Sequence, residues 1–337
     1  MNNSNIPLGI SIVIVTYNGE QRLPATLDYI MRQEVDPGIH WELVVVDNAS
    51  MDDTVGITQR TWNSDISLRI IHEPKKGVAF VRIRGIEEAK YEFILFVDDD
   101  NRIAPDWVQR IFQIFTDYPE IGMLGGYNSG DFESPPPDWF ESMKESFAIG
   151  PQGIRTGDIT DSRGYVWGAG MAFRKSVFLR IQQCGFIPLL TSREDGKLAG
   201  GEDVELSYLF KMAGYRIWYF SDLKLSHFIP AHRFTWNYAV SLNKGAGENI
   251  FYLGLYTLSM NNCRWLFFRM FQRSITEFAY VILQYFRYLL NTNKHKQYTL
   301  LFYYSKSRLF ITFKNILNYR SYYIQIDQLR KQINSIH

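Results

Sequence analysis

A run of apolar residues that ends in three carboxylates most constrains how this chain can fold. Residues 93–97 (FILFV) have the length and the β-branched and aromatic content of a buried strand, and Asp98, Asp99 and Asp100 follow directly. In open α/β sheets, ligands bind beyond the carboxyl ends of the strands. Adjacent carboxylates repel one another, and a divalent cation with oxygen ligands is the simplest partner that would hold them together. Taken alone, these acids could equally form an acidic turn or a helix cap.

Strands and helices alternate along the first hundred residues. Continuous β-branched or apolar runs at residues 9–15 and 41–46 are typical of strands buried on both faces, and a shorter run occupies residues 68–71. The spacing of apolar residues predicts helices over residues 20–33 and 77–90. This alternation indicates a mostly parallel, Rossmann-like sheet flanked by helices, with right-handed crossovers. We therefore expect an α/β fold.

Polar residues follow each of the predicted strands. Thr16, Tyr17 and Asn18 follow the first strand and Asp47 follows the second, so they should lie at the same sheet edge as the three acids. No G-x-G-x-x-G segment follows the first strand, and the chain contains no G-x-x-x-x-G-K-[ST] phosphate loop. A nucleotide at this edge would therefore need metal and side chains, rather than a glycine-rich loop, to hold its phosphates.

Four segments together resemble the signatures of family-two glycosyltransferases of the GT-A fold. They are IVIVTYN at residues 12–18, VVVDNAS at 44–50, GVAFVR at 77–82 and FVDDDN at 96–101. The resemblance covers about residues 9–230, and four matches in the correct order are far more specific than one. It implies a GT-A sheet that binds a nucleotide-diphosphate sugar.

The resemblance also implies roles for individual residues at the sheet edge. The residues that it assigns to the nucleotide are Thr16, Tyr17, Asn18, Asp47, Arg82, Asp98 and Asp99. Asp100 would hold Mg²⁺ or Mn²⁺ on the diphosphate, and His227 would be a second metal ligand, with a purely structural histidine as the alternative. The family usually has Ala-Arg-Asn where this chain has Val81-Arg82-Ile83. Arg82 matches the arginine of the family, so its role near the nucleotide is still expected. Ile83 replaces the asparagine, so the contact that the asparagine makes is not expected here.

The resemblance extends to a glycine-rich segment expected beneath the donor sugar. This segment is GYVWGAGMAFRK, residues 164–175. Gly168 would let the backbone approach a ligand closely. Trp167 would stack on a sugar face or, alternatively, lie in the core.

A second acidic motif, GGEDVEL at residues 200–206, matches the Glu-Asp motif of the family at the start of a helix. A helix N-terminus favours ionised carboxylates. Inverting transfer of a sugar needs a base that takes the proton of the acceptor hydroxyl. By the match we assign the base to Asp203 and acceptor binding to Glu202, with simple helix capping as the alternative.

The C-terminal part of the chain has a different charge from the rest. Residues 261–337 contain twelve Lys or Arg and two acidic residues, a net charge of +10, whereas the first 260 residues contain 24 basic and 33 acidic residues, a net charge of −9. Such asymmetry suggests different partners. We expect a glycosyltransferase domain over residues 1–230, with a nucleotide-sugar half at about 1–127 and an acceptor half at about 128–230. A basic, aromatic-rich, mainly α-helical extension would follow at 231–337.

The extension has two candidate environments. Charged residues interrupt the apolar run at 265–290, so we do not expect it to span a membrane. It would either pack as a mostly buried helix or lie in a membrane interface with its basic residues toward anionic lipid, and the charge of residues 261–337 favours the interface. Nucleic acid is not an expected partner, because no binding motif is present.

Together these features predict a metal-dependent, inverting glycosyltransferase. Its donor would be a nucleotide sugar, with uracil the commonest base in the family, and its acceptor a growing poly- or oligosaccharide that is free or lipid-linked. The alternatives are a non-catalytic sugar-nucleotide-binding protein and a sugar-1-phosphate nucleotidyltransferase. No signal peptide is visible and Cys184 and Cys263 make no disulfide framework, so we expect a cytoplasmic protein, with or without peripheral attachment to the inner face of the cell membrane.

Overall fold

The computed structural model describes residues 6–190, 198, 200–261 and 266–335, and the chain divides into two compact units. The first unit consists of Met1–Asp131, Ala148–Gln183 and Leu206–Ile229. The second unit consists of Phe132–Phe147, Cys184–Glu205 and Pro230–His337. The last change of unit coincides with the boundary expected near residue 230. Two segments expected in the acceptor half, Phe132–Phe147 and Cys184–Glu205, belong to the second unit instead.

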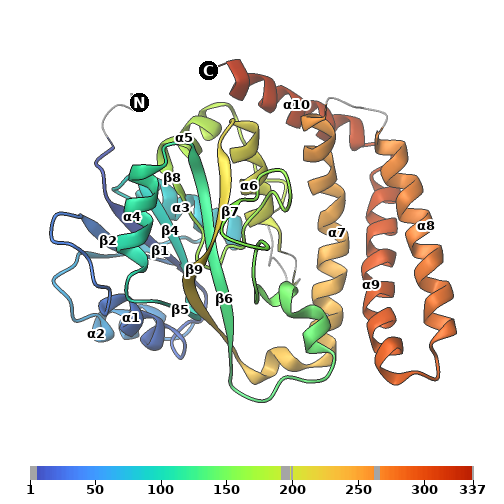
Figure 1. Cartoon of the computed structure of the whole chain (residues 1–337), viewed down its shortest axis with the longest axis horizontal. Helices are drawn as coiled ribbons and strands as arrows, with labels where there is room; N and C mark the ends of the chain where they lie inside the picture. The colour runs from blue at the N-terminus through green and yellow to red at the C-terminus, as the bar shows by residue number, and fades with distance from the viewer. Residues whose placement is uncertain (1–5, 191–197, 199, 262–265, 336–337) are drawn as a thin grey trace. The chain divides into compact units, whose positions relative to one another are not determined.

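The first unit is organised around one mixed sheet (Figure 1). Its strands are β1 (Ile10–Thr16), β2 (Trp41–Asp47), β3 (Leu68–His72), β4 (Phe93–Asp98), β5 (Asn101–Ile103), β6 (Ile121–Phe132), β7 (Gly157–Asp158), β8 (Ala172–Arg174) and β9 (Arg216–Ile229). The strand order is β3-β2-β1-β4-β8-β6-β9-β5, and β7 pairs with β9. The neighbours β3, β2, β1 and β4 are parallel, whereas β8 runs antiparallel to β4. The predicted α/β fold is confirmed.

Helices pack on both faces of this sheet. They are α1 (Leu23–Met31), α2 (Thr54–Thr61), α3 (Val78–Glu88), α4 (Trp107–Asp117) and α5 (Lys175–Gln183). On one face, α1 and α4 share a core with alternate strand residues such as Ile12 and Ile14. On the other face, α3 lies over Val13 and Val46, where a Cβ on Gly85 would be 2.4 Å from the Val13 side chain. Burial on both faces is why these strands are continuous apolar runs.

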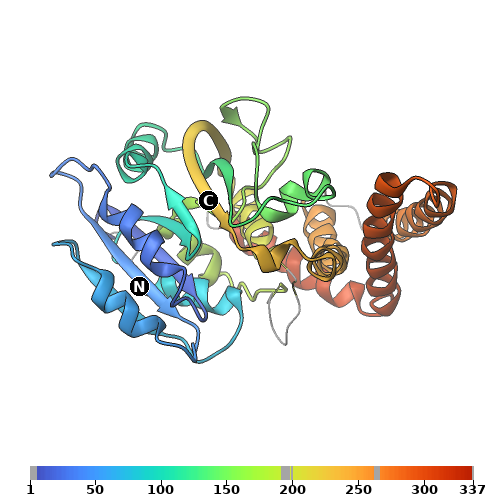
Figure 2. The same ribbon diagram turned by 90° about the horizontal axis from the view of Figure 1, so that it is seen from below.

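The second unit is mainly helical. Its elements are η2 (Phe140–Phe147), η3 (Ala231–Phe234), α7 (Trp236–Met260), α8 (Leu266–Arg287), α9 (Thr292–Lys314) and α10 (Tyr319–Ser335), and α6 (Glu202–Met212) begins in it. Figure 2 shows α7, α8 and α9 nearly end-on. A Cβ on Gly247 of α7 would lie 2.2 Å from the carbonyl oxygen of Tyr304 in α9, so glycine permits these two helices to approach closely. The expected helical extension is thus present.

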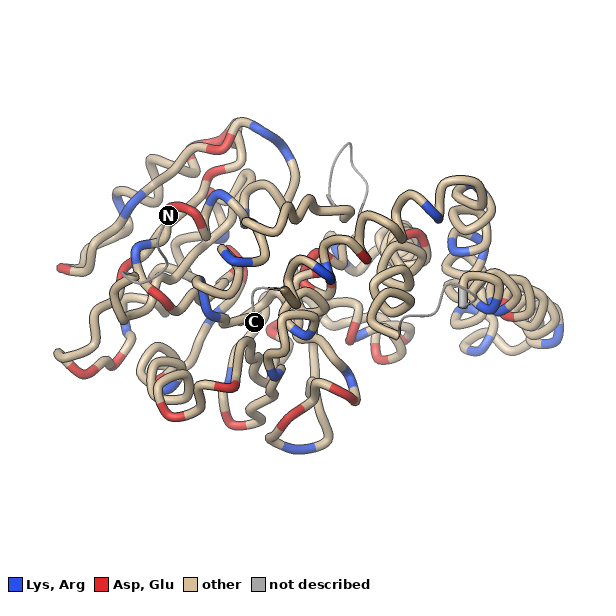
Figure 3. The backbone as a smooth tube through the Cα atoms, turned by 90° about the horizontal axis from the view of Figure 1, so that it is seen from above, with Lys and Arg blue, Asp and Glu red and all other residues tan. Residues whose placement is uncertain are grey.

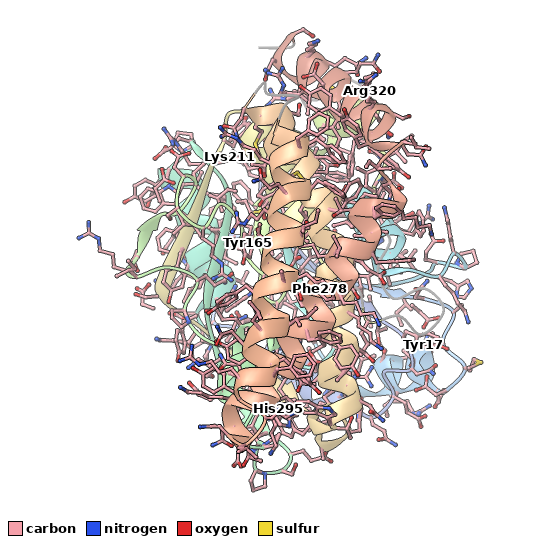
Figure 4. The ribbon with its side chains drawn as sticks, turned by 90° about the vertical axis from the view of Figure 1, so that its right-hand side faces the viewer. Tyr17, Tyr165, Lys211, Phe278, His295 and Arg320 are labelled. Carbon is pink, nitrogen blue, oxygen red and sulfur yellow. The ribbon has the colours of Figure 1, made fainter. Side chains whose placement is uncertain are left out.

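Aromatic side chains join the parts of the second unit. Phe140 of η2 contacts Phe234 of η3 at 5.2 Å between ring centroids, which ties segment 132–147 to the C-terminal helices. Helices α8 and α9 pack through Phe278, whose ring centroid lies 5.7 Å from that of Phe302 (Figure 4).

Helix α8 buries only one narrow side. Phe267 and Val281 are at most 4% exposed, whereas Phe268, Leu283 and Phe286 are 57%, 68% and 63% exposed. In the isolated chain this helix is therefore buried on one side only. None of the described helices combines the length and the apolar character needed to cross a bilayer. Of the two cysteines, Cys184 is buried and Cys263 lies outside the described residues.

Candidate active site

The carboxyl ends of the central parallel strands lie side by side in the first unit. In the strand register, Thr16 pairs with Asp47, and Val15 pairs with Asp98. This register brings the ends of β1, β2 and β4 to one edge of the sheet, where polar side chains were expected. Thr16 and Asp47 are buried there, and the side chain of Asp98 is 30% exposed.

The turns after β1 and β2 are hydrogen-bonded to each other. The amide of Asn18 donates to Ser50 Oγ at 2.9 Å, and Asn18 Oδ1 accepts from the amide of Met51 at 2.9 Å. Asn18 and Ala49 both adopt left-handed backbone conformations, with φ of 50° and 57°. Tyr17, labelled in Figure 4, remains 41% exposed between these braced residues. Asn18 thus shapes the turn that presents Tyr17 to solvent.

Asp47 and Asn48 connect the edge to the loop after β3. Nδ1 of His72 lies 3.2 Å from Asp47 Oδ2, and the His72 side chain is 63% exposed. Asn48 Nδ2 donates to the carbonyls of Glu73 and Lys75 at 3.0 and 2.8 Å. Sequence reasoning assigned no role to Asn48 or His72. The available signal was their position, because each lies at or directly after the end of a strand.

Asp99 is a structural brace in this fold. Its carboxylate accepts hydrogen bonds from Arg22 Nε and Nη2 at 2.9 and 2.8 Å and from Thr16 Oγ1 at 2.6 Å. Burial raises the pKa of Asp99 above its ordinary value, and the Arg22 guanidinium opposes that effect. These contacts engage both carboxylate oxygens of Asp99 and the hydroxyl hydrogen of Thr16. Both side chains therefore stabilise the base of the site, and their assignment to the nucleotide stays a prediction.

Arg82, Asp98 and Gly168 form a group at the end of β4. Arg82 Nη2 lies 3.4 Å from Asp98 Oδ1, and its guanidinium lies over the Phe96 ring, 5.1 Å from the centroid. A Cβ on Gly168 would be 2.3 Å from Arg82 Nη2. The absence of a side chain at Gly168 therefore makes room for Arg82. The arginine in turn places a positive charge beside Asp98.

Asp100 and His227 lie next to each other because β5 pairs with β9. Asn101 is opposite His227 in this antiparallel pair, and the amide of Phe228 donates to the carbonyl of Asp100 at 2.8 Å. His227 Nε2 is 3.3 Å from Asp100 Oδ1, and their side chains are 9% and 4% exposed. One carboxylate and one imidazole of the proposed metal site thus adjoin. Across the described part of the chain, no three His, Cys, Asp or Glu side chains converge as a ready metal cluster.

Trp167 is a core residue. It is 7% exposed, and the guanidinium of Arg163 lies 4.6 Å from the centroid of its ring. Its backbone amide donates to Gln152 Oε1 at 2.7 Å. The core alternative therefore describes Trp167 better than stacking on a sugar, because its ring is largely covered.

Glu202 and Asp203 occupy the first turn of α6, as predicted, and belong to the second unit. Both are half-buried, and Asp203 Oδ1 accepts from the amide of Val204 at 2.8 Å. Glu205 is the third acid of this turn and is 1% exposed. The helix N-terminus favours the ionised forms of these acids. Sequence reasoning did not single out Glu205.

A family model described as "Glycosyl transferase family 2" matches residues 11–181, just over half of the chain. The chain belongs to glycosyl transferase family 2. The resemblance seen in the sequence is thereby confirmed, and the matched range contains the edge residues of β1, β2 and β4.

Curated relatives include other members with glycosyltransferase names. "Putative glycosyltransferase EpsH" of Bacillus subtilis (strain 168) is 29% identical over 33% of this chain and 32% of its own length. "Glucosyl-dolichyl phosphate glucuronosyltransferase" of Haloferax volcanii is 20% identical over 67% of this chain and 72% of its own. An uncharacterized glycosyltransferase of Haemophilus influenzae is 26% identical over 55% of this chain and 59% of its own. The chain thus spans less than two thirds of the length of two of these three relatives.

Solved structures share the fold of this family-2 chain. The crystal structure of S. aureus TarS 1-349 superposes with a TM-score of 0.51 at 15% identity, covering 89% of this chain and 92% of that one. The complex of TarS 1-349 with UDP-GlcNAc also gives a TM-score of 0.51 at 15% identity, with 89% and 93% covered. At this identity the likeness shows the fold alone.

Proposed function

We propose that this chain is a metal-dependent, inverting glycosyltransferase that moves a sugar from a UDP-sugar to a hydroxyl of a poly- or oligosaccharide. The observation that carries the proposal is the sheet edge of the first unit, where the β1–β2–β4 register gathers Asp47 and Asp98 and β5–β9 pairing adds Asp100. Family membership supports the reaction class. The UDP-GlcNAc complex of TarS 1-349 supports the nucleotide, although only by analogy of fold.

The nucleoside would lie over the turns of β1 and β2. Tyr17 offers an exposed ring to the base, and Asn18 holds the turn that presents it. Asp47 offers carboxylate oxygens for the ribose, and His72 lies beside it. Asp98 would accept from the ribose, with Arg82 close enough to meet the phosphates.

Asp100 and His227 are the residues that would hold the metal ion. Mg²⁺ is commonly bound by one or two carboxylates, waters and substrate phosphates, so a single protein carboxylate fits this cation. Imidazole adds affinity for Mn²⁺. His227 Nε2 lies within 3.3 Å of Asp100 Oδ1, so a small shift would let both atoms face one ion. When bound, the ion would neutralise charge on the departing diphosphate.

Asp203 is the proposed base. Its carboxylate would take the proton of the acceptor hydroxyl as that oxygen bonds to the anomeric carbon. The bond between the anomeric carbon and the diphosphate oxygen breaks on the opposite side, and the configuration inverts. Glu202, its neighbour in the first turn of α6, would bind the acceptor.

A lipid-linked acceptor reached at an anionic membrane surface is the finer part of the proposal. The exposed apolar side chains of α8, among them Leu283 and Phe286, share its surface with Arg269, Arg273 and Arg287. An apolar face with basic residues suits a membrane interface. Figure 3 shows basic positions recurring along the C-terminal helices. The name of the Haloferax relative also refers to a lipid-linked sugar, glucosyl-dolichyl phosphate.

The test is transfer itself. The protein with Mn²⁺ is offered UDP-, GDP- and dTDP-sugars together with free and polyprenyl-phosphate-linked oligosaccharides, and products are detected by mass spectrometry. We expect a product from a UDP-sugar, with the anomeric configuration inverted by NMR. Nucleotide binding without transfer to any acceptor or to water would favour a non-catalytic binding protein. Retention of the anomeric configuration would remove Asp203 as a direct base.

A further inference from the structure

The segment from Gly200 to Glu205 carries the proposed base, and each end of this segment is hydrogen-bonded to helix α7. All of the contacts concerned lie within the second unit. At one end, Asn249 Nδ2 donates a hydrogen bond to the carbonyl of Gly200. At the other end, Tyr256 Oη donates to Glu205 Oε1 at 2.7 Å. Glu202 and Asp203 lie between these two attachment points.

The two α7 residues are suited to act together. They are seven positions apart, about two turns of helix, so they project from the same side of α7. Asn249 is 8% exposed and Tyr256 is 1% exposed, so each makes its contact away from solvent. Gly201, next to the first contact, has φ of 109°, which an L side chain rarely adopts. A Cβ there would lie 3.2 Å from Leu190 Cδ1. The backbone of this segment is therefore closely specified.

Glu205 connects three parts of the second unit. Besides Tyr256, its carboxylate accepts from the backbone amides of Leu189 and Leu190 at 2.9 and 3.3 Å. A buried carboxylate left without its donors is costly, so these bonds hold the first turn of α6, α7 and the 189–190 segment in one arrangement. At 1% exposure, Glu205 cannot meet a substrate directly.

We propose that Glu205, Tyr256 and Asn249 form a latch that positions Glu202 and Asp203 for the transfer reaction. Glu205 is then a positioning residue, and α7 is part of the transfer machinery. The inference rests on the proposed function only in treating Asp203 as the base. The attachment of the segment to α7 does not depend on that assignment.

The carboxyl group of Glu205, in the centre of the latch, can change its charge near neutral pH. Burial, with a smaller contribution from the nearby Glu202, raises the pKa of Glu205 to about 7 against the effect of its three hydrogen-bond donors. Among the described residues, the groups that face Glu205 are the Tyr256 hydroxyl from α7, the amides of Leu189 and Leu190, and Glu202 on its own helix. A role in positioning therefore has a readout that simple packing lacks, namely the pH profile of turnover.

The experiment compares the full-length wild type with Tyr256→Phe, and Tyr252→Phe is the matched control. Tyr252 lies one turn earlier on α7, and its hydroxyl bonds to Asn315 and Tyr322 rather than to Glu205. Hydrogen exchange of the amides of residues 201–206 is measured by mass spectrometry. UDP release from UDP-GlcNAc with Mn²⁺, water acting as acceptor, reports turnover. Calorimetry with UDP reports the donor site.

For Tyr256→Phe we expect exchange at residues 201–206 to become about tenfold faster and kcat for UDP release to fall about tenfold. The Kd for UDP should stay within twofold of wild type, and Tyr252→Phe should match wild type in all three measurements. Glu205→Gln keeps the shape and most acceptor contacts, so it should retain more turnover than Glu205→Ala. It should also lose the part of the pH dependence of kcat that falls near pH 7.

Three results would overturn the inference. The first is unchanged exchange and turnover in Tyr256→Phe. The second is faster exchange in β1–β4 as well, which would indicate general destabilisation, and the third is an equal effect of Tyr252→Phe. If the exchange result holds while wild type transfers no sugar from any donor to any acceptor of the transfer assay, the attachment of the segment to α7 stands and the proposed function fails, so the two failures are distinguishable.

Discussion

The sheet edge and the latch both rely on buried carboxylates, but the two regions stabilise them differently. At the edge, Asp99 faces the guanidinium of Arg22, and Asp98 faces Arg82. In the latch, Glu205 is held by a tyrosine hydroxyl and two backbone amides, all of them neutral donors. A neighbouring cation favours the ionised form more strongly than a neutral donor does. The edge thus pairs these acids with guanidinium groups, whereas the latch holds its acid with neutral donors alone.

The largest expected effect tests the reactive group of the second unit. Asp203→Asn keeps the shape of the side chain and removes its basicity, so kcat for sugar transfer should fall by about 10²–10⁴-fold. Affinity for UDP should change less than twofold, because the edge is intact. Asp222→Asn, at an exposed acid paired with Arg110, is the control. Turnover of Asp203→Asn within tenfold of wild type would mean that another group is the base.

The next effect tests the ion pair at the edge. Arg22→Ala leaves the buried carboxylate of Asp99 without its cation, so the free energy of unfolding in urea should fall by about 3–5 kcal/mol. The matched control is Arg32→Ala, whose partner Asp28 is also on α1 and whose ion pair is exposed. The control should cost less than about 1 kcal/mol. Equal losses in the two variants would contradict the brace assigned to Asp99.

The pH dependence of folding stability should distinguish Glu205 of the latch from the acids of the sheet edge. The folded-state pKa of Glu205 is raised to about 7, so between about pH 4.5 and pH 7 the folded chain holds a proton that the unfolded chain has released. Stability from this group therefore falls as pH rises through that window, by on the order of 3 kcal/mol. Urea unfolding at pH 5 and pH 7.5 should show a smaller decrease in Glu205→Gln than in wild type. Identical decreases would show that Glu205 does not titrate in this way.

A smaller effect is expected at Gly168. A methyl group there would meet the guanidinium at the far end of the Arg82 side chain, so we expect stability to change little while the guanidinium moves away from Asp98. We expect UDP to bind about three- to tenfold more weakly by calorimetry to Gly168→Ala. Gly38→Ala, where a Cβ would meet only the side chain of Asp36, should bind UDP as wild type does. Unchanged affinity for UDP in Gly168→Ala would show that the position of Arg82 does not matter for nucleotide binding.

The sequence predicts the sheet edge because strand ends in a parallel sheet must meet. Asp47, Asp98 and Asp100 could thus be placed together from three apolar runs. The partner of Asp99 could not, because Arg22 reaches it only through the packing of α1. The position of His227 next to Asp100 was expected from the family resemblance, and the pairing of β5 with β9 accounts for it.

The latch lay further from what the sequence reveals. The pattern GEDVE marks a helix start, yet it does not say that Tyr256, 51 residues later, will meet Glu205. Helix–helix pairing depends on which faces are complementary in three dimensions. The apolar and polar residues of α7 do not separate onto distinct faces, so its sequence does not show which side packs against which neighbour. Trp167 likewise could not be assigned between sugar and core until its surroundings were known.

Calorimetry with UDP tests the central claim most directly. Wild type, Asp100→Ala and the control Asp106→Ala, an exposed acid before α4, are titrated with and without Mn²⁺. We expect Mn²⁺ to strengthen binding at least about tenfold in wild type and Asp106→Ala, and this gain to be lost in Asp100→Ala. UDP binding that is indifferent both to Mn²⁺ and to Asp100 would contradict a metal-bridged nucleotide site at this edge.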